Sequence, residues 1–293
     1  MPVEVWGMIA VGLVVLLVGF LLVRGRLAAA SGAGRILVLA PICEGSALAV
    51  FAAEHFLAPH DLAPIVPHWL PAPMFWVYFV GAALLAAALS FIAWRCVRWS
   101  ASLLALLFLI IVATVDLPNL PRHLQERLFW TLTVRELCFA AGAMVLAGSV
   151  WPRSSPAGLM LMRIGRTLVG AIFVFYAIQH FLFPRYVPGV PLEKLIPAWV
   201  PAPVLLSYFV GVTLLLAGVG LLIRRTVRIA AATSGTVLLL LTLFFYVPIM
   251  LMELHTPLAV EGVNYVFDTL LFASTALLAG YGVDPGPASS SEP

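Results

Sequence analysis

The sequence predicts an all-α integral membrane protein with nine transmembrane helices. Hydrophobic residues make up 63 % of the chain and charged residues only 10 %, and the mean hydropathy is +1.09. A soluble domain of this length carries far more charge. Long apolar runs bounded by Arg, Pro or Gly recur along the chain, each near the roughly 20 residues that a helix needs to cross a bilayer. In addition, one segment rich in proline and aromatic residues occurs twice.

The first apolar run predicts a leading span at residues 3–23. Arg24 and Arg26 follow it directly. A cleaved signal peptide carries its basic residues before the apolar run rather than after it. We therefore expect residues 1–33 to form a retained transmembrane span and a basic turn.

The duplicated segment runs from Glu54 to Gly81 and again from Gln179 to Gly211. The matching pairs are His55 and His180, Pro67 and Pro197, Trp69 and Trp199, and Gly148 and Gly280. Along the chain the separation of matching residues rises from 125 to 130 and then to 132. Both changes fall in expected outer loops, where insertions cost little. A duplication of this kind predicts two copies of one architecture.

Each copy is expected to form a four-helix bundle, over residues 34–150 and 151–281. The predicted spans are 36–58, 74–94, 100–116 and 128–150 in the first copy and 165–183, 203–223, 230–252 and 263–281 in the second. Because four is an even number, both copies enter the membrane from the same side and form parallel repeats related by an axis along the membrane normal. The last residues, 282–293, are rich in Ser, Pro and Gly and predict a disordered cytoplasmic tail.

The basic residues predict the orientation. With the amino terminus outside, the cytoplasmic segments hold 11 of the 16 Lys and Arg residues. The positive-inside rule therefore favours an outside amino terminus. The net charge of +3 is spread over short clusters between spans, so we expect the lipid bilayer and no nucleic acid as a partner.

The loop motifs resemble those of the DoxX-like family of small bacterial membrane proteins. In both copies H-F-x-x-P is followed by P-x-W-[LV]-P-A-P, Y-F-x-G and a basic R-x-x-R turn. The resemblance covers roughly Gly34–Gly148 and Arg163–Gly280. It implies a four-helix bundle per copy, a place in the bacterial cytoplasmic (inner) membrane and an association with redox chemistry. Because the family takes its name from a subunit of a thiosulfate–quinone oxidoreductase, the resemblance also implies quinone as cofactor and a redox protein or membrane complex as partner.

Ionisable residues inside the predicted spans are the candidates for chemistry. A charge at mid-bilayer costs about 3 kcal/mol or more, so such groups face protein or water and pair with one another. A His on the first span and an acid on the fourth occur in both copies, and both lie toward the outer surface. We therefore expect His55 to pair with Glu136 and His180 to pair with Asp268, each within its own bundle.

Several ionisable residues occur in the first copy alone. Glu44, Glu54 and Arg135 correspond to Val169, Gln179 and Phe267 in the second copy. We predict one outward-opening polar pocket in the outer third of the first bundle, with the catalytic candidates Glu54, His55, Arg135 and Glu136. Candidates for binding a cofactor are Glu44, His180 and Asp268. Such a pocket is suited to binding a quinone carbonyl, relaying protons or holding an anionic substrate; the alternative is a buried ion-pair network without a ligand.

Other chemistries remain open at this stage. Haem needs two facing imidazoles, which His55 and His180 would supply only across the repeat interface. A metal ion would draw on His55 with Glu54 and Glu136. The three cysteines form no C-x-x-C motif, which argues against a disulfide catalyst.

We favour a redox-associated subunit that contacts quinone or a redox partner. The alternatives are a carrier that uses a cavity between the two bundles, and a structural or assembly subunit.

Overall fold

The computed structural model describes residues 3–152, 154–190 and 193–282, and nearly all of this chain is helical. Apart from residue 282, the predicted tail lies outside the described residues. The helices are α1 (Val3–Ala29), α2 (Ala33–Leu37), α3 (Ala40–Leu57), α4 (Pro59–Leu62), η1 (Ala63–Ile65), α5 (Pro73–Ala93), α6 (Val97–Ile111), η2 (Val112–Asp116), α7 (Leu117–Asn119), η3 (Leu120–Arg122), α8 (Arg127–Ser149), α9 (Pro156–Leu182), α10 (Pro203–Leu222), α11 (Val227–Leu241), η4 (Thr242–Tyr246), α12 (Val247–Glu253) and α13 (Ala259–Leu278).

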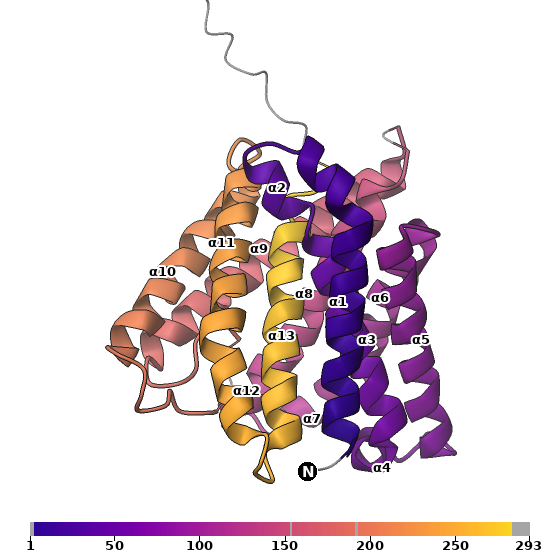
Figure 1. The fold of residues 1–293 in the computed structure, drawn as a ribbon, viewed down its shortest axis with the longest axis vertical. Coiled ribbons are helices and arrows are strands. Elements are labelled where there is room, and N and C mark those ends of the chain that lie inside the picture. The colour runs from indigo at the N-terminus through magenta and orange to yellow at the C-terminus, as the bar shows by residue number, and fades with distance from the viewer. Residues whose placement is uncertain (1–2, 153, 191–192, 283–293) are drawn as a thin grey trace, which may run out of the picture.

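The long helices run up and down along the long axis of the molecule (Figure 1). The start of α1 lies at one end together with α4 and α12, and we call this the α4 end; α2 lies at the opposite end, the α2 end. Eight helical segments are long and apolar enough to cross a membrane. Large apolar side chains point outward between the two ends, and Leu216 is 68 % and Phe244 67 % exposed. An outer surface of this kind fits a multi-pass membrane protein.

The ninth predicted span corresponds to α13, which is not among the eight apolar segments. Glu261, Asn264 and Asp268 lower the hydropathy of its first half. Every residue from Tyr265 to Leu278 is buried. The helix lies at the centre of the molecule and packs against α1, α3, α8, α11 and α12 (Figure 1). α13 is therefore the core helix of the fold.

Neighbouring helices pack in an order that links the two predicted bundles. α3, α5, α6 and α8 pack in succession, and so do α9, α10, α11 and α13. In addition, α8 packs against α9, α13 packs against α3, and α8 packs against α13. The fourth helix of each predicted copy thus contacts the first helix of the other copy, and the two groups interlock.

Local backbone features recur 130 residues apart. Ala72 and Ala202, in the two W-x-P-A-P motifs, both adopt left-handed backbone conformations, with φ of 53° and 48°. The π-helical turns η2 and η4 also occupy corresponding places, each just before a proline. Pro118 and Pro248 lack the N–H that an α-helix needs at these positions, which explains the local change of helical register.

The α2 end of the core helix is held by side chains from other segments. The guanidinium of Arg166 on α9 donates to the carbonyls of Ala279 (2.9 Å) and Tyr281 (2.8 Å). These bonds satisfy carbonyls that a helix end leaves free. The Tyr281 hydroxyl in turn donates to the Leu37 carbonyl at 3.1 Å, and burial raises the pKa of this phenol above its usual range.

Close helix contacts predict which glycines are needed. A Cβ at Gly165 on α9 would lie 2.5 Å from the carbonyl oxygen of Ala141 on α8, whereas a Cβ at Gly25 on α1 meets nothing within 4 Å. We expect Gly165→Ala to separate α8 from α9 and to lower the free energy of unfolding by about 1–3 kcal/mol. Gly25→Ala is the matched control and should be neutral. Thermal unfolding in detergent measures both, and equal melting temperatures would contradict the close α8–α9 contact.

Candidate functional site

The site begins at the last turn of α3. Pro59 starts the next short helix and restricts the backbone before it, so α3 ends at Leu57. Glu54 and His55 lie in this last turn, and neighbouring residues on a helix point about 100° apart. Glu54 faces α13, while the Cβ of His55 lies 2.7 Å from the Cβ position of Gly81 on α5. The absence of a side chain at Gly81 gives the imidazole its place.

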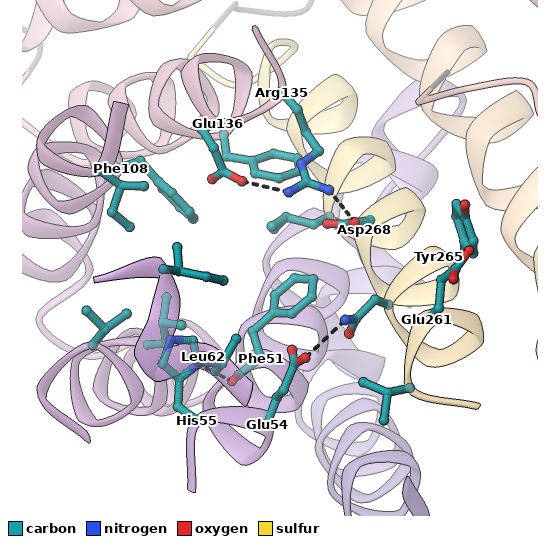
Figure 2. A pocket seen from close by; sticks show the side chains of 18 residues that line it. Phe51, Glu54, His55, Leu62, Phe108, Arg135, Glu136, Glu261, Tyr265 and Asp268 are labelled. Atoms are coloured by element: carbon teal, nitrogen blue, oxygen red, sulfur yellow. Dashed lines mark hydrogen bonds and ion pairs between the residues drawn. The ribbon is translucent and has the colours of Figure 1, made fainter. Parts of the chain in front are cut away.

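A cavity of about 570 Å³ lies in the half of the molecule nearer the α4 end. Its walls come from α3, α4, η1, α5, α6, α8 and α13. The polar groups around it are Glu54, His55, Arg135, Glu136, Glu261, Asn264 and Asp268. Figure 2 shows that Arg135, Glu136 and Asp268 lie on one side of this space and that Glu54 and His55 lie across it. The four predicted catalytic candidates therefore line one pocket, and Asp268 joins them.

Arg135 is shared by two carboxylates. Its Nη1 lies 2.5 Å from Oδ2 of Asp268, and its Nη2 lies 2.9 Å from Oε1 of Glu136 (Figure 2). The expected pairing of each histidine with an acid in its own bundle is therefore wrong. Since α13 packs between α3 and α8, Asp268 reaches an arginine of the other copy.

A second polar contact connects α3 with α13. The Asn264 amide donates to Oε1 of Glu54 at 3.0 Å. Asn264 and Asp268 lie four residues apart, so they share one face of α13. The sequence analysis missed Asn264. The spacing of Glu261, Asn264 and Asp268 was the available signal, because it places three polar residues on one helical face.

Asp116 is another residue that the sequence analysis missed. It ends the π-helical turn η2, and its charge interacts with those of Glu136 and Arg135. Its Oδ2 is buried and has no hydrogen-bond partner. The signal in the sequence was an acid at the end of an apolar run, two residues before Pro118.

Unpartnered polar atoms gather at this site. Within the described residues, Nε of Arg135, Oδ1 of Asn264 and Oδ2 of Asp116 are buried without hydrogen-bond partners in the protein. Buried polar atoms without any partner are rare in folded proteins. Their concentration indicates that this region is built to meet polar groups of a ligand or water.

Glu44 and His180 lie outside this cavity. The hydroxyl of Ser274 on α13 donates to Oε2 of the fully buried Glu44, whose Oε1 has no partner. His180 lies in the second copy, where its Nδ1 donates to the Tyr176 carbonyl at 2.6 Å and its Nε2 accepts from the Gly189 N–H at 2.9 Å. Both nitrogens of His180 are occupied by protein groups, so neither is available to ligate haem.

An apolar groove of about 410 Å³ continues from the polar cavity. It lies between α5, α6 and the loop after η1, and Trp69, Trp76 and Phe79 line it. Five residues line both spaces: His55, Leu62, Ile65, Val80 and Ile111. The side chains at its edge reach the apolar outer surface, where Phe79 is 50 % and Ile110 48 % exposed. The polar cavity and this groove therefore adjoin, and the edge of the groove lies at the apolar outer surface.

The charges of the cavity restrict its ligands. Four of its lining residues are acids, and its single Arg is already paired with two of them. An anionic substrate is therefore disfavoured. Among the described residues, no group of three or more His, Cys, Asp and Glu side chains is arranged to hold a metal ion.

Comparison with known proteins gives one partial match. The model of a domain of unknown function (DUF8561) matches residues 45–126, from α3 to the helical turns before α8. This stretch includes Glu54, His55 and Asp116 but neither Arg135 nor α13. No curated protein and no solved structure matches the chain.

The shared arginine predicts a strong energetic coupling between α8 and α13. Removing one partner of a buried ion pair costs about 3–5 kcal/mol, because the other charge stays buried. We expect Arg135→Gln and Asp268→Asn each to lower the free energy of unfolding by this amount. In the double variant the free energy of unfolding should fall by less than the sum of the losses in the two single variants. Unfolding in mixed detergent micelles gives these values.

The exposed pair of His123 and Glu126, whose side chains are 34 % and 57 % exposed, supplies the matched control. Glu126→Gln should change the free energy of unfolding by less than about 1 kcal/mol. Additive losses in the Arg135 and Asp268 double variant would show that the pair is not coupled.

Proposed function

We propose that the first repeat of this protein binds a lipid-soluble quinone and serves a membrane redox system. The observation that carries this proposal is that the polar cavity and the apolar groove adjoin along five shared residues. A quinone combines a polar ring with a long apolar tail. The cavity suits the ring, and the groove suits the first part of the tail.

The side chains around the cavity fit the two-electron, two-proton chemistry that a bound quinone would supply. The guanidinium of Arg135 lines the cavity, and a guanidinium N–H is suited to donate to a carbonyl oxygen. Glu54, Glu136 and Asp268 supply carboxyl groups that can hold or release protons. His55, at the junction of cavity and groove, lies where a ring substituent would pass.

The proposal includes an architecture and an orientation. We propose nine spans, with α13 as the ninth, arranged as a leading helix and two parallel repeats. The backbone features that recur 130 residues apart support the repeats. Basic side chains cluster at the α2 end, for example Arg26 and Arg35 near α2 and Arg98 at the start of α6. The positive-inside rule then places the α2 end in the cytoplasm and the cavity in the outer half of a bacterial inner membrane.

The resemblance to the DoxX-like family points to the same class of function, with a redox protein or membrane complex as partner. The other two classes predict different behaviour. A carrier would move a solute across vesicles without a need for an apolar tail, and a structural subunit would bind neither quinone nor solute.

Fluorescence of the purified protein tests quinone binding, because Trp69 and Trp76 line the groove and a bound quinone quenches tryptophan emission. We expect saturable quenching by a decyl-tailed benzoquinone and much weaker quenching by the same ring without its tail. Val80→Phe narrows the junction between cavity and groove and should weaken binding of the tailed compound at least tenfold.

Leu89→Phe is the matched control, since Leu89 lies on the same helix with 58 % of its side chain exposed on the outer surface. This variant should bind as the parent does. Quenching that does not saturate, or that Val80→Phe and Leu89→Phe affect equally, would show partition into the detergent and contradict the proposal.

A further inference from the structure

In the second copy a loop occupies the place that corresponds to the cavity of the first copy. Residues Val187–Val190 are buried between α9 and α11. The Cβ position of Gly189 lies 3.5 Å from Leu238 and 3.6 Å from Leu241. At the separation of 130 residues, these two leucines correspond to Phe108 and Ile111, which line the cavity of the first copy. The loop therefore occupies the place that is open in the first copy.

A difference in loop length explains this asymmetry. From His180 to Pro197 the second copy has five more residues than the first has from His55 to Pro67. The extra length lets the chain enter the bundle. In the first copy the shorter connection forms α4 and η1, which contribute Leu62 and Ile65 to the rim of the cavity.

The buried loop shows which hydrogen bonds this site makes with an occupant. The Gly189 N–H donates to Nε2 of His180 at 2.9 Å, and the adjacent Pro188 carbonyl accepts from the Tyr246 hydroxyl. The occupant thus presents a donor to the histidine and an acceptor to the tyrosine.

His55 is held in the same way as His180. Its Nδ1 donates to the Phe51 carbonyl at 2.7 Å, four residues earlier, as Nδ1 of His180 does to Tyr176. In the neutral ring this bond puts the proton on Nδ1 and leaves Nε2 as an acceptor. Within the described residues Nε2 of His55 has no hydrogen-bond partner, and the ring borders both the cavity and the groove.

A different residue occupies the position in the first copy that corresponds to Tyr246. At the same separation of 130 residues it corresponds to Asp116, whose buried Oδ2 has no partner. A hydroxyl donor in the second copy is thus replaced by a carboxyl group, which accepts when ionised. Of these two positions only His55 lines the cavity, so the first copy offers Nε2 of His55 as an acceptor there.

We propose that the first repeat selects a ligand with a hydrogen-bond donor for Nε2 of His55, and hence a quinol rather than a quinone. This inference rests on the proposed function and names the redox form that the site binds more tightly. His55 is a binding residue in this proposal. A quinone ring offers carbonyl oxygens only, whereas the two hydroxyl groups of a quinol match acceptors of this kind.

Three decyl-tailed compounds test the proposal: the hydroquinone, kept reduced without oxygen, its dimethyl ether and the parent quinone. We expect the hydroquinone to bind about tenfold more tightly than the other two, the size of one well-formed hydrogen bond. His55→Leu should remove this preference and leave the affinities for ether and quinone unchanged. His55→Gln, whose amide oxygen can accept near the position of Nε2, should keep most of the preference.

His180→Gln is the matched control. It changes the corresponding histidine, whose Nε2 is already bonded to the loop. We therefore expect it to lower the melting temperature and to leave the preference for hydroquinone unchanged. Equal affinities for hydroquinone and quinone, or a preference that persists in His55→Leu, would overturn the selection of quinol while leaving the quinone site in place. Failure of all three compounds to bind would instead overturn the proposed function.

Discussion

The arrangement of this protein depends on how the polar face of α13 is satisfied. In an apolar solvent each unpaired polar group costs several kcal/mol, so a helix that carries Asn264 and Asp268 needs partners on neighbouring helices. Arg135 supplies one and Glu54 supplies the other, from α8 and α3 respectively. The same face continues to Ser274, which bonds Glu44 of α3. Three polar contacts thus hold α13 against the first repeat, although its sequence belongs to the second. They also explain how a helix that carries these polar residues can be buried at the centre of the molecule.

This sharing of α13 makes the candidate site a product of both repeats. The first repeat contributes the histidine, the arginine and most apolar walls, and α13 contributes the remaining wall with Glu261, Asn264 and Asp268. A single four-helix unit would leave Arg135 without Asp268 and Glu54 without Asn264. The duplication therefore does more than enlarge the protein, because it completes the polar side of a cavity that one copy alone would leave open.

The sequence predicted how deep each polar residue lies in the membrane better than it predicted which side chains contact one another. Hydropathy and proline placement predicted the spans, and the rise of a helix predicted that Glu54, His55, Arg135 and Glu136 lie in the same third of the first bundle. All four line one cavity. The partner of each group was not predictable in the same way. Depth does not say which helix lies beside which, and the assumption of self-contained bundles led to the wrong partners for Glu136 and Asp268. Asp116 was missed because it was counted as the end of a span, and its position in the site depends on the π-helical turn before Pro118.

The two histidines show how one fold can carry a binding site in one half and a packed interior in the other. Their rings are held by the same backbone bond and approach the same glycine of the following helix, at Gly81 and Gly211. The surroundings of His55 and His180 are therefore alike as far as Nε2 of each ring. The two histidines differ in the group that faces this atom. In the second half the Gly189 N–H donates to Nε2 of His180, and this hydrogen bond offsets the cost of burying the ring. In the first half the described chain supplies no donor to Nε2 of His55, and the ring borders the cavity instead. The difference in loop length therefore separates a half in which the ring is bonded by the chain itself from a half in which it faces an open space.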